Sequence, residues 1–112
     1  MSESNTIRVS LLRHGGFLGR SLTLELDSGS LSEEESRTLS KMINAANFFN
    51  LPAAIMPQGG ADRFQYEVTV EEQAKRHTVN TADGAVPEQL QPLIDYLVEA
   101  ARRSLTKPTE TG

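Results

Sequence analysis

The sequence contains no cysteine and no tryptophan, and only 5% of its residues are aromatic. The absence of cysteine excludes a disulfide framework and any thiolate metal site, so stability has to come from packing. No apolar run is long enough to span a bilayer, and the first ten residues, MSESNTIRVS, lack the basic start and apolar stretch of a signal peptide. We therefore expect a cytoplasmic protein with no membrane partner.

Basic residues are outnumbered. The chain has 11 Lys and Arg against 15 Asp and Glu, which gives a net charge of -4 at pH 7. The basic residues are spread along the sequence rather than gathered, so no patch is suited to a phosphate backbone and nucleic acid is not an expected partner. The length of 112 residues suits one domain. We expect a flexible N-terminal segment at 1–6, a single domain at 7–103 and a flexible tail at 104–112.

Three stretches alternate apolar and polar residues with a period of two, which predicts half-buried strands. Their apolar members are Ile7, Val9 and Leu11, then Leu22, Leu24 and Leu26, then Phe64, Tyr66, Val68 and Val70. A fourth strand is predicted over 77–81. Because only Val79 is strongly apolar there, we expect it to be an exposed edge strand.

Two stretches show helical spacing instead. Ser32 and Glu35 have the S-x-x-E spacing of a capping box, which predicts the start of the first helix, and Pro87 and Pro92 lie near the start of the second. The two apolar stripes are Leu39, Met42, Ile43, Ala46 and Phe49, then Leu90, Leu93, Ile94, Leu97 and Ala101. The predicted order is ββαββα, an α+β domain with a four-stranded, mainly antiparallel sheet packed against two helices.

The sequence offers no pattern for catalysis, and we predict that the chain is not an enzyme. His14 and His77 are the only imidazoles, and no H-x-x-x-H or H-E-x-x-H pair exists to bind zinc. The acidic run 33–35 lies at a predicted helix N-terminus, where the helix dipole accounts for it. The serines have no G-x-S-x-G setting. We expect no catalytic residue, no metal ligand and no cofactor.

The segment RHGGFLGRS at 13–21 joins the first two predicted strands. It is not a phosphate-binding P-loop, since Gly15 and Gly19 are too close, Arg20 stands in place of lysine and a strand follows. It is not a dinucleotide-binding G-x-G-x-x-G motif either, because His14 occupies a glycine position.

The glycines of this segment are explained by a tight hairpin connection. Phe17 and Leu18 are not, because two large apolar side chains at a loop tip have to pack or to meet a partner. Composition alone leaves both a structural and a binding interpretation open.

The arrangement of short motifs along the chain is similar to that of a known family. The motifs are Arg13-x-Gly15-Gly16-x-x-Gly19, Asp62-x-Phe64-x-Tyr66-x-Val68, Asp83-Gly84 and Val86-Pro87, followed by Leu90, Pro92, Leu93 and Leu97 in the last helix. Over roughly residues 7–100 the chain resembles emfourin, a bacterial family of protein inhibitors of thermolysin-like zinc metallopeptidases such as protealysin.

The resemblance implies an inhibitor that is a monomer when free and forms a 1:1 complex with a thermolysin-like metallopeptidase. Such peptidases prefer a bulky apolar residue on the primed side of the cut, so Phe17 or Leu18 would occupy that pocket. The first strand and the 13–19 loop would then lie in the substrate cleft, with strand-edge amides bonding along it as an extended peptide would. The implied contact residues are Arg13, His14, Gly15, Gly16, Phe17, Leu18 and Gly19, with Met1, Ser2, Gln58, Gly59 and Gly60 as secondary contacts.

Two other functions stay open at this stage. One is a non-inhibitory protein-interaction module that uses the same loop. The other is a small-ligand-binding α+β domain with its pocket between the sheet and the helices, which a thermal shift with a ligand library would reveal.

Overall fold

The computed structural model describes residues 7–15, 21–57, 63–73 and 75–106. These residues form five strands, two α-helices and two short 3-10 turns. The strands are β1 (Ile7–Gly15), β2 (Leu22–Asp27), β3 (Ala54–Ile55), β4 (Phe64–Glu72) and β5 (Lys75–Ala82). The helices are α1 (Glu33–Ala46) and α2 (Gln91–Thr106), and the turns are η1 (Ser28–Ser30) and η2 (Phe48–Asn50).

The strands form one sheet in the order β2-β1-β4-β5-β3. All neighbours are antiparallel except β3, which runs parallel to β5. The α+β class is confirmed, but the expectation of four strands is corrected to five in a mixed sheet. The backbone N–H of Asn80 donates to the Ala53 carbonyl at 2.8 Å, and the Thr81 hydroxyl donates to the Ile55 carbonyl at 2.7 Å. A two-residue strand is too short to show alternation, which is why the sequence pattern misses it.

The edge predicted over 77–81 is therefore wrong at Asn80 and Thr81, which β3 covers. Strand β5 is also longer than predicted, and Val79, Thr81 and Ala82 are buried. The edge of β5 is covered because the short segment β3 pairs with it. The hydrophobicity of β5 itself does not indicate this pairing.

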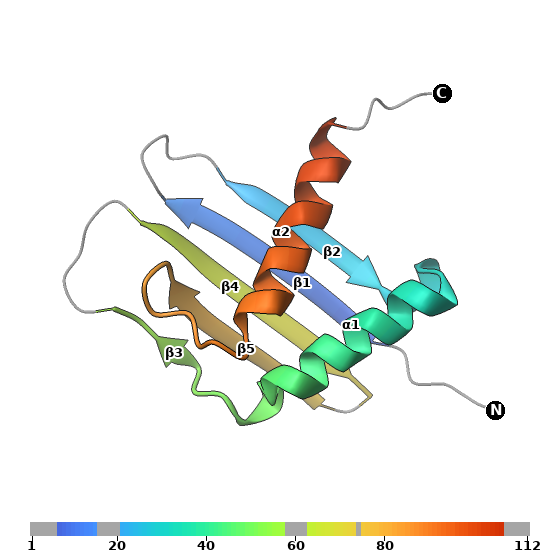
Figure 1. Ribbon diagram of the computed structural model, residues 1–112, viewed down its shortest axis with the longest axis horizontal. Coiled ribbons are helices and arrows are strands. Elements are labelled where there is room, and N and C mark those ends of the chain that lie inside the picture. The colour runs from blue at the N-terminus through green and yellow to red at the C-terminus, as the bar shows by residue number, and fades with distance from the viewer. Residues whose placement is uncertain (1–6, 16–20, 58–62, 74, 107–112) are drawn as a thin grey trace.

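Both helices cover the same face of the sheet, and no helix of the described residues lies on the opposite face (Figure 1). The predicted alternation holds. The core between sheet and helices contains Ile7, Val9, Leu11, Leu39, Ile43, Phe48, Val68, Val70, Val79, Leu90, Leu93, Ile94 and Leu97. The uncovered face is polar. On it Arg8 lies 3.8 Å from both Asp27 and Glu71, and Arg76 lies 3.6 Å from Glu71, each distance joining a guanidinium nitrogen to a carboxylate oxygen.

The helix starts follow the predicted signals. The Ser32 hydroxyl accepts from the Glu35 N–H, and the Glu35 side chain accepts from the Ser32 N–H, both at 3.1 Å, so the capping box is formed. Helix α2 begins at Gln91 and has Pro92 in its first turn, where a missing N–H costs no helical hydrogen bond. It continues to Thr106, three residues into the expected tail.

The remainder of that tail and the N-terminal segment 1–6 lie outside the described residues. Neither helix has the combination of length and hydropathy that crossing a membrane requires, among the residues the structure describes.

Candidate functional site

The predicted contact residues divide into a described and an undescribed part. Arg13, His14 and Gly15 are the last three residues of β1. Outside the described residues lie Gly16, Phe17, Leu18 and Gly19 of the main loop, and the secondary candidates Met1, Ser2, Gln58, Gly59 and Gly60. The described residues from which these segments extend make up the candidate site.

The two glycine-containing segments join the sheet at neighbouring points. Gly15 is paired with Phe64 in the register of β1 and β4. Residues 16–20 follow Gly15, while residues 58–62 are separated from Phe64 by one residue. The main loop and the secondary loop at 58–60, which are far apart in sequence, therefore start from a shared base.

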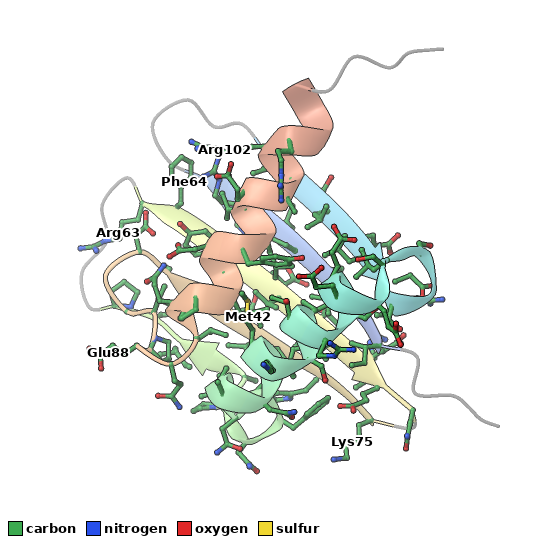
Figure 2. The ribbon with its side chains drawn as sticks, turned by 45° about the vertical axis from the view of Figure 1, so that its right-hand side comes forward. Met42, Arg63, Phe64, Lys75, Glu88 and Arg102 are labelled. Carbon is green, nitrogen blue, oxygen red and sulfur yellow. The ribbon has the colours of Figure 1, made fainter. Side chains whose placement is uncertain are left out.

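This base lies at one end of the sheet, opposite to Lys75 (Figure 2). We call it the loop end of the sheet, made of Arg13, His14, Gly15, Arg63, Phe64, Asp83 and Gly84. Residues 1–6 join the chain at Ile7, which is the other end of β1. The structure thus brings together the attachment points of two of the three predicted contact segments, and it separates the third.

Arg63 is packed between two glycines that have positive φ angles. At Gly15 (φ +90°) an added Cβ would lie 2.8 Å from the Arg63 carbonyl oxygen. At Gly84 (φ +94°) an added Cβ would overlap Nη1 of the Arg63 guanidinium. Both positions need glycine for the backbone angle and for the close approach. The end of β1, the residue before β4 and the turn after β5 are consequently in direct contact.

Asp83 connects the same elements by hydrogen bonds. Its backbone N–H donates to the Phe64 carbonyl at 3.0 Å, and its own carbonyl accepts from Arg63 Nη1 at 2.9 Å. Its carboxylate accepts from the Tyr66 hydroxyl at 2.7 Å. All three partners lie within the four residues that follow Asp62 in the chain. Sequence reasoning treated Asp83-Gly84 as a family motif only and missed this role.

Arg13 completes the loop end from the helix-covered face. Its guanidinium carbon lies 4.1 Å from the centroid of the Phe64 ring, a cation–π arrangement. Its Nε is buried and has no hydrogen-bond partner among the described residues. Arg13 is opposite Tyr66 in the register. Burial, followed by the hydrogen bond to Asp83, raises the pKa of Tyr66 to about 12, so at neutral pH the Tyr66 hydroxyl keeps its proton and donates.

The expected use of the first strand needs a correction. Strand β1 is central: it pairs with β2 from Arg8 to Arg13 and with β4 from Ile7 to Gly15. Its backbone groups are therefore engaged on both sides over most of its length. At the loop end of the strand, His14 and Gly15 have no partner in β2, so this end of β1 has one edge without a ladder in the described residues.

Few features of the described residues point to catalysis or to a bound ligand. No group of three His, Asp or Glu side chains able to hold a metal ion occurs among the described residues. His77 has a structural setting, with Nε2 2.7 Å from the Leu51 carbonyl and its ring edge-on to Phe48. Apolar side chains fill the space between sheet and helices. A shallow hollow of about 460 Å3 lies instead on the uncovered face, lined in part by Leu12, Glu25 and Glu67.

The family of the chain bears on these interpretations. The family model of emfourin matches residues 11–98, which include the whole loop end, all of α1 and the first half of α2. The chain belongs to the emfourin family. Neither the curated proteins nor the solved structures gave a match. Emfourin membership assigns the chain, in general terms, the role of a metallopeptidase inhibitor with a peptidase as its partner.

Proposed function

We propose that this emfourin inhibits a thermolysin-like zinc metallopeptidase in a 1:1 complex, by placing the 13–19 loop in the substrate cleft. The observation that carries the proposal is the pairing of Gly15 with Phe64, which gives the main loop and the 58–60 loop one base. A single peptidase surface can meet both loops because they start side by side.

The packing of the loop end favours tight binding. A loop that is held before it binds loses less conformational entropy in the complex, and this raises affinity without added contact area. Arg63 against Gly15 and Gly84, and the three hydrogen bonds of Asp83, fix the described ends of both loops. Rigid support of this kind is what an inhibitor needs if it is to resist being bound as a flexible substrate.

Phe17 and Leu18 remain the proposed anchors for the apolar pocket of the peptidase, on the strength of their sequence position between glycines. His14 and Gly15 are the proposed part of β1 that takes part in the contact, because they follow the last residue of β1 that pairs with β2. Gln58, Gly59 and Gly60 are proposed as secondary contacts. Met1 and Ser2 would have to contact the enzyme from the opposite end of β1, about 27 Å from Gly15 at the usual rise of a strand.

The direct experiment is a titration of thermolysin at nanomolar concentration with the purified protein, using a fluorogenic peptide, with and without preincubation. Activity should fall linearly and reach its minimum at one equivalent. Unchanged activity of thermolysin and of protealysin-type relatives would overturn the proposal.

The assignment of the anchors needs a second step. The double variant Phe17→Gly/Leu18→Gly should keep its unfolding transition and lose most of its inhibition, since anchor residues dominate the energy of an interface. Lys75→Ala, at the opposite end of the sheet, is the matched surface control and should inhibit as the unchanged protein does. Unfolding of the double variant would place these side chains in the core instead.

A further inference from the structure

Strand β2 is an edge strand of the sheet. It pairs with β1 on one side, and in the part of the chain that the structure describes no backbone hydrogen bond reaches its other side. Edge strands present a row of N–H and C=O groups that can pair with another chain. Which residues of β2 present them follows from the direction of the hydrogen bonds in β1.

The N–H of Ile7 donates to the Ser28 hydroxyl at 2.9 Å, which shows that it points toward the β2 side of β1. Backbone N–H groups alternate sides along a strand, so those of Val9, Leu11 and Arg13 face β2 as well. Their partners in the register are Leu26, Leu24 and Leu22.

The three leucines of β2 therefore direct their backbone groups inward, to β1. It follows that Thr23 and Glu25, which alternate with them, direct their N–H and C=O groups outward. Both side chains are exposed and lie on the uncovered face of the sheet. Together these two residues offer two donors and two acceptors to an approaching strand.

We propose that this outer edge of β2 pairs with an extended strand of the inhibited peptidase. The inference rests on the proposed function and assigns to β2 the strand pairing that the family resemblance implied for the first strand. The main loop leads through Ser21 directly into Leu22, so the loop and β2 form one continuous stretch of chain. When the cleft receives the loop, the contact with the peptidase can continue along β2 for about 20 Å, at the usual rise of a strand.

The chemistry of the edge favours a different protein over a second copy of this chain. Natural edges are often protected by proline, lysine or a bulge, and the segment SLTLELD at 21–27 contains neither proline nor lysine. Glu25 has no ion pair among the described residues. Antiparallel pairing of two copies centred on Glu25 would place two carboxylates directly opposite each other, which is unfavourable. A partner strand with a basic or neutral side chain at that point fits.

Amide hydrogen exchange tests the pairing in the unmodified protein. In the free protein the amides of Thr23 and Glu25 should exchange fast, and those of Leu22 and Leu24 slowly. In the saturated complex with thermolysin, exchange at Thr23 and Glu25 should slow by about tenfold or more, as expected for amides that gain a hydrogen bond.

Fast exchange at these two amides in a complex that is fully inhibited would overturn the edge pairing and leave the inhibitory function intact. Formation of no complex would overturn both. Protection in the free protein that grows with its concentration would identify a second copy as the occupant, against the proposal.

Substitution gives an independent readout. Thr23→Pro removes an outward N–H and leaves the ladder to β1 intact, because proline is tolerated on an edge strand where its nitrogen faces away from the sheet. Its inhibition constant should rise about tenfold, the effect of one lost hydrogen bond. Thr23→Ala, which keeps the N–H, should inhibit normally. Equal inhibition by the two variants, with circular dichroism showing both folded, would overturn the proposal.

Discussion

The guanidinium group of Arg13 lies over the ring of Phe64, with its central carbon 4.1 Å from the ring centroid. Arg13 precedes the main loop, and Phe64 follows the 58–60 loop. The stacked pair therefore joins the bases of two segments that are far apart in the chain. A substitution in this pair should change the relative position of the two loops more than it changes the fold.

Phe64→Leu should lower the free energy of unfolding by about 1 kcal/mol, because it removes a partly buried cation–π contact while keeping most of the apolar volume. It should also weaken inhibition, since the two loops lose a shared support. Phe49→Leu is the matched control: Lys75 Nζ lies 5.1 Å from the Phe49 ring centroid, at the other end of the sheet. Urea unfolding should show a comparable loss for both variants, with inhibition reduced only in Phe64→Leu. Equal inhibition by both would separate the stacked pair from function.

Gly15→Ala should destabilise the protein by about 1–3 kcal/mol. The cost combines the positive φ angle with a contact of 2.8 Å between the new Cβ and the Arg63 carbonyl oxygen, which belongs to the backbone and cannot rotate away. Gly29→Ala is the control, because the φ angle of Gly29 is not positive and the atom nearest to an added Cβ would be an oxygen of the Asp27 carboxylate, at 3.3 Å. Thermal unfolding should show a change of less than about 1 kcal/mol for Gly29→Ala. A Gly15→Ala variant as stable as Gly29→Ala would contradict the packing described at the loop end.

Gly84→Ala differs from Gly15→Ala in the group that the new Cβ would meet. At Gly84 this group is the end of the flexible Arg63 side chain, whereas at Gly15 it is backbone. Arg63→Ala should also be destabilising, since it removes the donor to the Asp83 carbonyl. The double variant should be less destabilised than the sum of the single variants by about 1 kcal/mol, because the overlap is lost when Arg63 is truncated. A double-mutant cycle by urea unfolding measures this coupling, and strict additivity would show that the two residues do not touch.

A strand with one buried face alternates apolar and polar residues, so its pattern can be recognised in the sequence. The predictions that depend on such local patterns are confirmed. The alternation in Ile7, Val9 and Leu11 exists because these residues pack under the helices, and the capping box at Ser32 acts within one turn of chain. Strand order is not encoded locally. Strands β1 and β2 have the same alternation, yet β1 is central and β2 is at the edge, so alternation alone does not tell which strand has an open edge.

The candidate site was predictable only in part, for a related reason. The glycines and apolar residues at 13–19 are adjacent in sequence and stand out by composition. Asp83 does not, because its role depends on Arg63, Phe64 and Tyr66, which lie some 20 residues earlier and meet it only through the pairing of β4 with β5. Asp83 is thus recognisable only once the fold is known.

The hydrogen bond from Tyr66 to Asp83 predicts a pH dependence of stability. The pKa of Tyr66 is raised from 10.0 to about 12, mainly by burial and then by Asp83, so the folded protein keeps this proton where the unfolded chain loses it. The contribution of Tyr66 to stability is therefore complete below about pH 10 and declines as pH rises toward 12. Tyr66→Phe should lower the free energy of unfolding at pH 8 by about 1 kcal/mol, because the Asp83 carboxylate loses a donor, and should reduce the decline at alkaline pH. Urea unfolding of both proteins from pH 8 to pH 11 measures the difference. A wild-type curve no steeper than that of Tyr66→Phe above pH 10 would show that Tyr66 titrates equally in the folded and unfolded states, against the buried hydrogen bond at the loop end.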